Sequence, residues 1–455
     1  MRFDFSGIPL RPQAFSKRPM TFCDSEPKSA LSAVIDVVAV ETGDPLARTT
    51  WQAVQLKNLL NHAGQRSKFW KHRIGPNGTD AKLQSLPILS RSALTEQVSG
   101  EGSLLKPGDG IGTRTNSTSG SSGVPVKFFT SVMNAQYNHI RSMAQYFMED
   151  RDLGLNRVQF VFSPALGSGG LRVAKADTWL GSLGACVRSG TSRIVEYFNP
   201  DMAALRAELE KEPIGYLVAA HWGVEAMLPH IDPPALKHAG LAMWLPVGGG
   251  VDVEIQKSFV AADIPVRGTY SAEEVGYIGC ECERIAGSYH VATSNVLVEI
   301  DSEQSFRCGG KTLGPVLVTH LHSYATPFIR YDIGDVATIA DRCECGHEGP
   351  TLSDIHGRSK NLLSHPDGSV TPIYIKASQL QAICPLKEFR IRQTELEKIV
   401  VEIVGRDPIS AAQTDALSDF IKKLAGPSFK VQVQILQEIN WGSSLKRLGF
   451  RNELL

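Results

Sequence analysis

The sequence has no excess of either charge and no long apolar run. Its 47 Lys and Arg residues balance 47 Asp and Glu residues, so the formal net charge is zero. A nucleic-acid-binding protein normally carries a basic face, and this balance argues against one. No run of 18 or more apolar residues occurs, which argues against a membrane-spanning helix. A small anionic ligand stays compatible with this composition, because a few local donors are enough to bind one.

Cysteine is scarce, and the features of a secretory signal are missing. Eight cysteines in 455 residues are too few and too unevenly spaced for a disulfide scaffold. The first residues lack the apolar stretch of a signal peptide. We therefore expect a reducing, cytoplasmic compartment.

The length is enough for two or three domains. The strand-like segments are 158–164, 214–220 and 241–247, and the helical segments between them are 202–212 and 224–231. This alternation predicts an α/β fold with a largely parallel sheet. Short, close strands between residues 295 and 340 then indicate an antiparallel β region.

Both ends of the chain have a different pattern. Residues 1–50 show little periodicity and predict an irregular lead-in, before a helix at 51–63. Near the other end, the apolar spacing predicts helices at 395–405 and 416–426, followed by a strand at 430–436. A smaller α+β module is therefore expected after residue 357.

The most informative segment is a loop rich in serine and glycine, which runs from Thr118 to Lys127. Glycines let the backbone turn tightly and bring its N–H groups close to an anion. The hydroxyls add donors and Lys127 adds a positive charge, a combination that suits a polyphosphate. No Gly-Lys-Ser/Thr follows, so the loop is not a Walker A motif. Taken alone, such a stretch is more often a flexible loop.

This loop and the segments after it resemble the adenylate-forming enzymes, and most of all the branch of phenylacetate–CoA ligase and coenzyme F390 synthetase. The further segments are the Gly-rich stretch 165–190, the turn Gly248-Gly249-Gly250, the run Tyr270-Ser271-Ala272-Glu273-Glu274-Val275-Gly276, and Tyr331-Asp332-Ile333-Gly334-Asp335 followed by Ile355-His356-Gly357-Arg358. The motifs stand in the family's order, and the likeness covers residues 51–450.

The resemblance implies an ATP-dependent acid–thiol ligase. Such an enzyme converts a carboxylic acid to an acyl-adenylate and then transfers the acyl group to CoA, with ATP, Mg²⁺ and CoA taking part. The expected substrate is an aryl or small organic acid. Three alternatives stay open: transfer to a carrier-protein thiol, transfer to an amine, and a non-catalytic member that only binds ligand. A homodimer is one assembly that we consider.

The resemblance also assigns roles to individual residues. The nucleotide-binding set is Thr118, Ser119, Gly120, Ser121, Ser122, Gly123 and Lys127 for the phosphates, Gly248, Gly249, Gly250, Tyr270, Ser271, Ala272 and Glu273 around the adenine and α-phosphate, and Asp335 and Arg358 for the ribose or phosphate. Glu274 is the implied Mg²⁺ ligand, since this hard cation favours oxygen. Taken singly, Glu274, Asp335 and Arg358 would each pass for ordinary surface or strand-end residues.

The resemblance places the acid pocket within 163–190, 219–224 and 247–251, with His221, Trp222 and Gly249 as lining residues. For His221 and Trp222, the alternative is a place in the core. When the family pattern is shifted by two residues along this sequence, its catalytic lysine aligns with Lys446. Alignment on the pair Lys446-Arg447 leaves that lysine missing.

Two residues depart from the family pattern. Glu273 stands where the family has Thr, which adds a carboxylate near the α-phosphate. Lys360 stands at the hinge position, where the branch usually has Asp. Lysine is tolerated there in other members of the superfamily, so the domain rotation is expected to be kept.

Four cysteine and histidine residues have spacings that suit structural zinc. Cys282, His290, Cys343 and Cys345 would make a closed Cys₃His set, and the resembled branch carries the same pieces. A Cys-x-Cys pair is otherwise often two unremarkable thiols. The next candidate ligands are Cys280 and His347. The remaining cysteines, Cys23, Cys186, Cys308 and Cys384, are expected to be packed or free thiols.

These observations predict an α/β chain of two parts. A large N-terminal adenylation domain, residues 1–357, would hold mixed parallel sheets and a zinc-bearing β region at 277–350. A small, mobile α+β domain, residues 358–455, would follow it.

Overall fold

The computed structural model describes residues 25–76, 78, 81–99, 113–117, 127–167, 169–308, 310–357, 362–373, 375, 377–440 and 450–454. The α-helices are α2 (Ser25–Thr42), α3 (Pro45–Arg66), α4 (Lys68–Ile74), α5 (Arg91–Ser99), α6 (Val132–Met148), α7 (Met202–Glu210), α8 (His221–Met227), α9 (Pro233–His238), α10 (Val253–Ala261), α11 (Ala377–Gln381) and α12 (Ala411–Ala425). Among the residues described, none of these helices has the length and apolar character needed to cross a membrane.

In the described part of the chain, the strands form two large sheets, one smaller sheet and two hairpins. They are β1 (Thr113–Ser117), β2 (Lys127–Ser131), β3 (Arg157–Phe162), β4 (Gly170–Ala176), β5 (Ser192–Phe198), β6 (Gly215–Ala220), β7 (Leu241–Val247), β8 (Thr269–Ala272), β9 (Gly276–Glu281), β10 (Tyr289–Val291), β11 (Val296–Ile300), β12 (Phe306–Cys308), β13 (Lys311–His320), β14 (Tyr331–Ala340), β15 (Thr351–His356), β16 (Leu362–Ser364), β17 (Val370–Pro372), β18 (Leu386–Glu395), β19 (Lys398–Gly405), β20 (Lys430–Ile435) and β21 (Phe450–Asn452).

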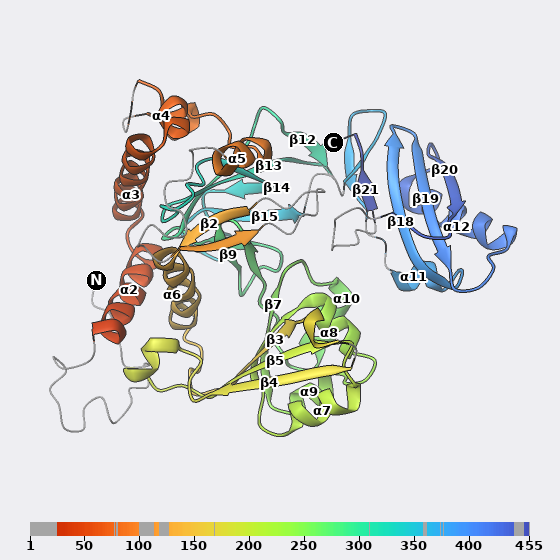
Figure 1. Cartoon of the computed structure of the whole chain (residues 1–455), viewed down its shortest axis with the longest axis horizontal. Helices are drawn as coiled ribbons and strands as arrows, with labels where there is room; N and C mark the ends of the chain where they lie inside the picture. Colours follow the sequence, from red (N-terminus) through yellow and green to blue (C-terminus); the bar gives the residue numbers. More distant parts are fainter. Residues whose placement is uncertain are drawn as a thin grey trace.

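The five-stranded sheet has the order β4-β5-β3-β6-β7 and is parallel except at β4. Helices cover it, and Figure 1 shows α7, α8, α9 and α10 gathered beside it. Strand β6 is buried along nearly its whole length, as expected for a parallel strand that is covered on both faces. The predicted α/β alternation is confirmed here.

The second large sheet is antiparallel, with the order β11-β13-β14-β15-β10-β9-β8 and β12 paired to β13. It confirms the expected β region between residues 295 and 340. Side chains of β8 and β14 nevertheless hydrogen-bond to each other, although three strands separate them in this order. The sheet therefore curls strongly, and this curl builds the candidate site described below.

The four-stranded sheet near the end of the chain has the order β20-β19-β18-β21. Its hydrophobic core is its own, built on residues such as Leu380, Ile391 and Leu417. Figure 1 shows it at the opposite end of the molecule from α2 and α3. A smaller apolar cluster joins Leu362 and Val370 to Cys308, Leu313 and Val336 of the antiparallel sheet.

Within this module, the helix predicted at 395–405 is wrong. Residues 398–405 form strand β19, whose six central residues are all buried. These are Ile399, Val400, Val401, Glu402, Ile403 and Val404, and they are mostly β-branched, which favours a strand. A short segment that is mostly apolar fits helical and extended periods alike, so spacing alone misled the prediction. The helix at 416–426 and the strand at 430–436 are confirmed by α12 and β20.

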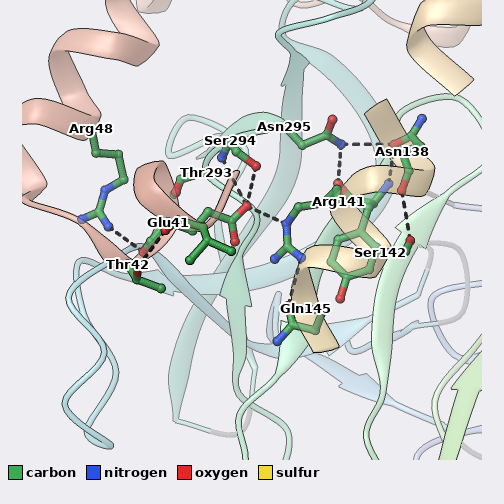
Figure 2. Close-up of polar contacts among 12 residues, drawn as sticks. Glu41, Thr42, Arg48, Asn138, Arg141, Ser142, Gln145, Thr293, Ser294 and Asn295 are labelled. Carbon is green, nitrogen blue, oxygen red and sulfur yellow. Dashed lines mark hydrogen bonds and ion pairs between the residues drawn. The ribbon is translucent and has the colours of Figure 1, made fainter. Parts of the chain in front are cut away.

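The irregular lead-in predicted for residues 1–50 is also wrong wherever the structure describes it, because α2 and the start of α3 occupy 25–50. Helix α2 buries Ala30, Val34, Val37 and Glu41, which lie on one helical face. Figure 2 shows Glu41 facing Arg141 of α6, with 2.6 Å between Glu41 Oε1 and Arg141 Nε. A buried ion pair therefore fastens α2 to the middle of the molecule.

Candidate active site

Glu274 lies in the turn between β8 and β9, where one hydrogen bond holds its carboxylate. The Tyr331 hydroxyl donates to Glu274 Oε1 over 3.2 Å. Burial raises the pKa of Tyr331, and the neighbouring Glu274 carboxylate raises it further, so the hydroxyl keeps its proton and acts as a donor. Glu274 is half-buried, whereas Glu273 is exposed. The structure thus distinguishes the two adjacent carboxylates.

The backbone after Glu274 is fixed by a residue of α6. Gly276 has a φ of +66°, and a Cβ at this position would lie 2.1 Å from Asn138 Oδ1. The backbone N–H of Tyr277 donates to the same Asn138 oxygen over 3.3 Å, and so does the Asn295 side chain. Only glycine fits this approach. No motif or spacing in the sequence indicated that Asn138 would support the Glu274 turn.

Tyr270 and Asp335, the implied adenine and ribose contacts, form a second pair. The Tyr270 hydroxyl donates to Asp335 Oδ2 over 2.9 Å, joining β8 to β14. Burial raises the pKa of Tyr270 well above its usual value, and Asp335 raises it further, so this hydroxyl is a donor at neutral pH. The sequence indicated both residues and did not indicate that they bond. The neighbouring motif residues Ser271 and Ala272 complete β8, with Ser271 exposed.

Lys127 marks the end of the candidate phosphate loop. It is exposed at the start of β2 and lies opposite Ser117 in the β1–β2 hairpin, so the two ends of the loop are held together. The next residue, Phe128, is fully buried in the same core cluster as Val275 and Tyr331. The backbone N–H of Phe129 also donates to Thr326 Oγ1 over 3.0 Å. Packing therefore brings the lysine end of the loop to the segments that carry Glu274.

Several predicted residues lie outside the described part of the chain. They are Thr118, Ser119, Gly120, Ser121, Ser122 and Gly123 of the loop, together with Arg358, Lys360 and Lys446. Their roles stay predictions. The described residues that precede and follow Lys446 in the sequence contact or belong to the four-stranded sheet. Arg390 of β18 donates to the Asn440 carbonyl over 2.8 Å, and β21 begins at Phe450.

The turn Gly248-Gly249-Gly250 follows β7 and is exposed. Gly249 lies against His221, because a Cβ there would be 2.6 Å from the imidazole Cε1. Trp222 follows at the start of α8 and meets the Phe162 ring edge-on, with 5.0 Å between the ring centroids. The structure thus brings His221, Trp222 and Gly249 to one edge of the parallel sheet.

The four predicted zinc ligands also come together. The nearest ligand atoms of Cys282, His290, Cys343 and Cys345 all lie within 4.8 Å of one another. The Cys343 and Cys282 Sγ atoms are 3.9 Å apart, and Cys345 Sγ lies 3.4 Å from His290 Nε2. Tetrahedral zinc with ordinary bond lengths requires about 3.8 Å between sulfurs and about 3.6 Å from sulfur to nitrogen. The donor set and its spacing therefore fit this metal.

The two reserve ligands lie beside this set and outside it. The His347 ring stacks on the His290 ring with 4.1 Å between centroids, and its backbone N–H donates to Cys345 Sγ over 3.4 Å. Cys280 instead contacts Glu149, with 3.6 Å from Sγ to Oε1. His347 therefore orients the cluster, in the way that residues around metal ligands commonly do.

Comparison with known proteins identifies the fold. The chain matches 2-hydroxyisobutyryl-CoA ligase in its postadenylation state, in complex with R3-HIB-AMP, with a TM-score of 0.59 and 16% identity over 91% of each chain. It matches the same ligase with 2-HIB-AMP and CoA in the thioesterification state with a TM-score of 0.54 and 16% identity, covering 91% of this chain and 92% of that one. GH3.15 acyl acid amido synthetase gives 0.53 and 12% identity, over 90% and 88%. No protein-family model and no curated protein matches the sequence. At these identities the likeness concerns the fold alone, and that fold is the mixed α/β architecture of the adenylate-forming ligases.

Proposed function

We propose that the protein activates a carboxylic acid with ATP and transfers the resulting acyl group to CoA. The observation that carries this proposal is the meeting of three segments at one place. Tyr331 holds Glu274, Tyr270 holds Asp335, and packing brings Lys127 to the same region. Nucleotide phosphates need a cation and a metal ligand, and a ribose needs a hydrogen-bond acceptor. The likeness in fold to ligases that form acyl-adenylates supports the same proposal.

In the first half-reaction, an oxygen of the acid's carboxylate attacks the α-phosphorus of ATP. The bond from this phosphorus to the bridging oxygen of the β-phosphate breaks, and pyrophosphate leaves. Lys127 would neutralise charge on the departing phosphates, and Asp335 would fix the ribose so that attack is in line. Glu274 would hold Mg²⁺, which supplies further positive charge to the phosphates when bound. In the second half-reaction the CoA thiolate attacks the acyl carbon and AMP leaves.

The finer predictions belong to this proposal. They are membership of the phenylacetate–CoA ligase branch, an aryl or small organic acid as substrate, a boundary after residue 357, a hinge at Lys360 and a catalytic lysine at Lys446. A cytoplasmic location and a homodimer also stay predictions. We further propose that zinc binds Cys282, His290, Cys343 and Cys345 and holds β9, β10 and the 343–347 turn together, without a part in catalysis.

Pyrophosphate exchange with a panel of carboxylic acids tests the proposal. At least one acid should support exchange of pyrophosphate into ATP, and adding CoA should release AMP with thioester. Lys127→Ala should slow exchange by about 100-fold or more, since one preorganised donor contributes about 2.7–4 kcal/mol to the transition state. Lys237→Ala, which removes a lysine of α9 that pairs with Asp263, is the matched control.

Each other outcome identifies an alternative. Exchange without CoA-dependent AMP release would favour a carrier-protein thiol or an amine as the acceptor. Absence of exchange with every acid, in protein that still binds ATP, would favour a non-catalytic ligand-binding protein. Equal exchange rates in Lys127→Ala and wild type would remove the loop assignment.

A further inference from the structure

Aromatic side chains gather at the carboxyl ends of the parallel strands. β3 lies between β5 and β6, so the chain runs to one side of β3 first and to the other side later. Ligands of open α/β sheets bind at such a switch point. Phe162 ends β3, Tyr197 lies near the end of β5, and Trp222 follows β6. The Phe162 centroid is 5.0 Å from that of Trp222 and 6.0 Å from that of Tyr197.

Two of these rings face solvent and the third does not. Phe162 is 45% exposed and Trp222 is 42% exposed, which is unusual for rings of this size that touch each other. Tyr197 is only 9% exposed. The cluster therefore presents an open apolar surface with a phenol beneath it.

The Tyr197 hydroxyl has no hydrogen-bond partner among the residues that the structure describes. Other buried tyrosines of the same region do have one: Tyr216, on the neighbouring β6, donates to the Asp152 carbonyl over 3.0 Å. The Tyr197 oxygen lies 2.3 Å from where a Cβ of Gly223 would be, so it occupies the space left by that glycine. Burial raises the pKa of Tyr197 to about 12, so the hydroxyl is protonated at neutral pH. A phenol hydroxyl without a protein partner, on a side chain that is mostly buried, is left to bond to water or to a ligand.

Helix α8 connects this phenol to the candidate adenine turn. His221 packs on Gly249, and Trp222 contacts Phe162. The Tyr197 hydroxyl packs against Gly223. These contacts come from three consecutive residues. An acyl-adenylate needs its acyl site directly beside its nucleotide site, and the first turn of α8 satisfies that requirement.

We propose that Phe162, Trp222 and Tyr197 form the acyl subsite and that it selects flat acids with a hydrogen-bonding substituent, such as ring-hydroxylated aromatic acids. The two exposed rings are perpendicular to each other, so one would stack on the flat acyl group and the other would meet its edge, while the Tyr197 hydroxyl would hydrogen-bond to its substituent. Tyr197 is then the specificity-determining residue. A site built to bond a substrate hydroxyl rejects the analogue that lacks it, because its own polar group is left unpaired. The inference rests on the proposed acid activation.

The experiment compares a hydroxylated aromatic acid with its unsubstituted analogue, 4-hydroxybenzoate with benzoate and 4-hydroxyphenylacetate with phenylacetate. Two quantities are measured for wild type and Tyr197→Phe: kcat/KM for pyrophosphate exchange, and the affinity of each acid by calorimetry. Wild type should prefer the hydroxylated acid, and Tyr197→Phe should lower that preference by about tenfold or more. The variant should lose activity towards the hydroxylated acid and keep it towards the other.

Tyr216→Phe is the matched control, because it removes a phenolic hydroxyl that has a protein partner on the same sheet. It should leave the preference unchanged and lower the melting temperature, whereas Tyr197→Phe should not lower it. Equal preference in wild type and Tyr197→Phe would overturn the inference, and so would a marked loss of thermal stability in Tyr197→Phe. Selective binding of the hydroxylated acid without pyrophosphate exchange would support the subsite and refute the proposed function. Exchange without selectivity would support the proposed function and refute the subsite. Neither binding preference nor exchange would refute both.

Discussion

Replacing Arg141 by methionine should lower the free energy of unfolding by about 3–5 kcal/mol, the usual effect of breaking a buried ion pair from one side. Arg141 and Glu41 have side chains that are only 3% and 7% exposed, with 2.6 Å between Nε and Oε1. Without the guanidinium, the Glu41 carboxylate would lose its ion-pair partner and keep two donors of Ser294, the hydroxyl over 2.5 Å and the backbone N–H over 3.4 Å. The guanidinium also lies 4.5 Å above the Tyr277 ring and donates to Gln145, so its loss removes several contacts together (Figure 2).

Urea unfolding measures this effect as a shift of the transition midpoint. The dependence of the unfolding free energy on urea concentration must be checked as well, since a chain of this size need not unfold in two states. The double variant Glu41→Leu with Arg141→Met should lose clearly less than Arg141→Met alone, because it leaves no unpaired buried charge. The control is Arg206→Met on α7. Arg206 and Glu210 are each 51% exposed, and an exposed pair of this spacing contributes about 0.3–0.5 kcal/mol. A loss for Arg141→Met no larger than for Arg206→Met would refute the reasoning.

Three further predictions concern the proposed magnesium and zinc sites and the predicted catalytic lysine. Glu274→Gln should raise the Mg²⁺ concentration needed for exchange by about tenfold, or about 1.4 kcal/mol, whereas exposed Glu273→Gln should change it little; the reverse order would move the magnesium assignment by one residue. Metal analysis should find one zinc per chain, and chelation or Cys345→Ser should lower the melting temperature; a zinc-free preparation of equal heat stability would contradict this. Lys446→Ala should slow acyl-adenylate formation by about tenfold or more and spare transfer from supplied acyl-adenylate to CoA, whereas equal loss in both steps would indicate a folding defect.

Local patterns predicted those parts of the fold in which each segment has one dominant period. The alternating segments between 158 and 247 and the helix at 416–426 belong to this class, and the structure confirms them. β19 does not belong to it, because its residues Ile399, Val400 and Ile403 fit one face of a helix as well as they fit a buried strand. Helix α2 was not predicted for another reason. Its buried face includes Glu41, which looks like a surface residue until Arg141 is known to face it. Its partner is 100 residues away, beyond the reach of local spacing.

The candidate site shows the same division. The order of the motifs indicated Glu274 and Asp335, and ligand spacing indicated the four cysteine and histidine residues, which the structure brings together. The sequence could not indicate the hydrogen bonds from Tyr331 to Glu274 and from Tyr270 to Asp335. These depend on the curl of the antiparallel sheet that brings β8 close to β14. Asn138 and Tyr197 belong to no motif, and only the packed structure reveals them.

The adjacent carboxylates Glu273 and Glu274 illustrate why the packed structure decides between neighbours in a motif. In the sequence, a glutamate stands where the family that it resembles has a threonine, and this puts two candidate ligands side by side. In the structure, Tyr331 is 1% exposed within the core cluster that also contains Leu89 and Phe128, so its hydroxyl has a fixed position. Only Glu274 reaches that hydroxyl, and Glu273 lies exposed on the turn. The additional carboxylate therefore adds negative charge on the solvent side without displacing the hydrogen bond of Glu274. This is why the substitution is compatible with a magnesium ligand at the next residue.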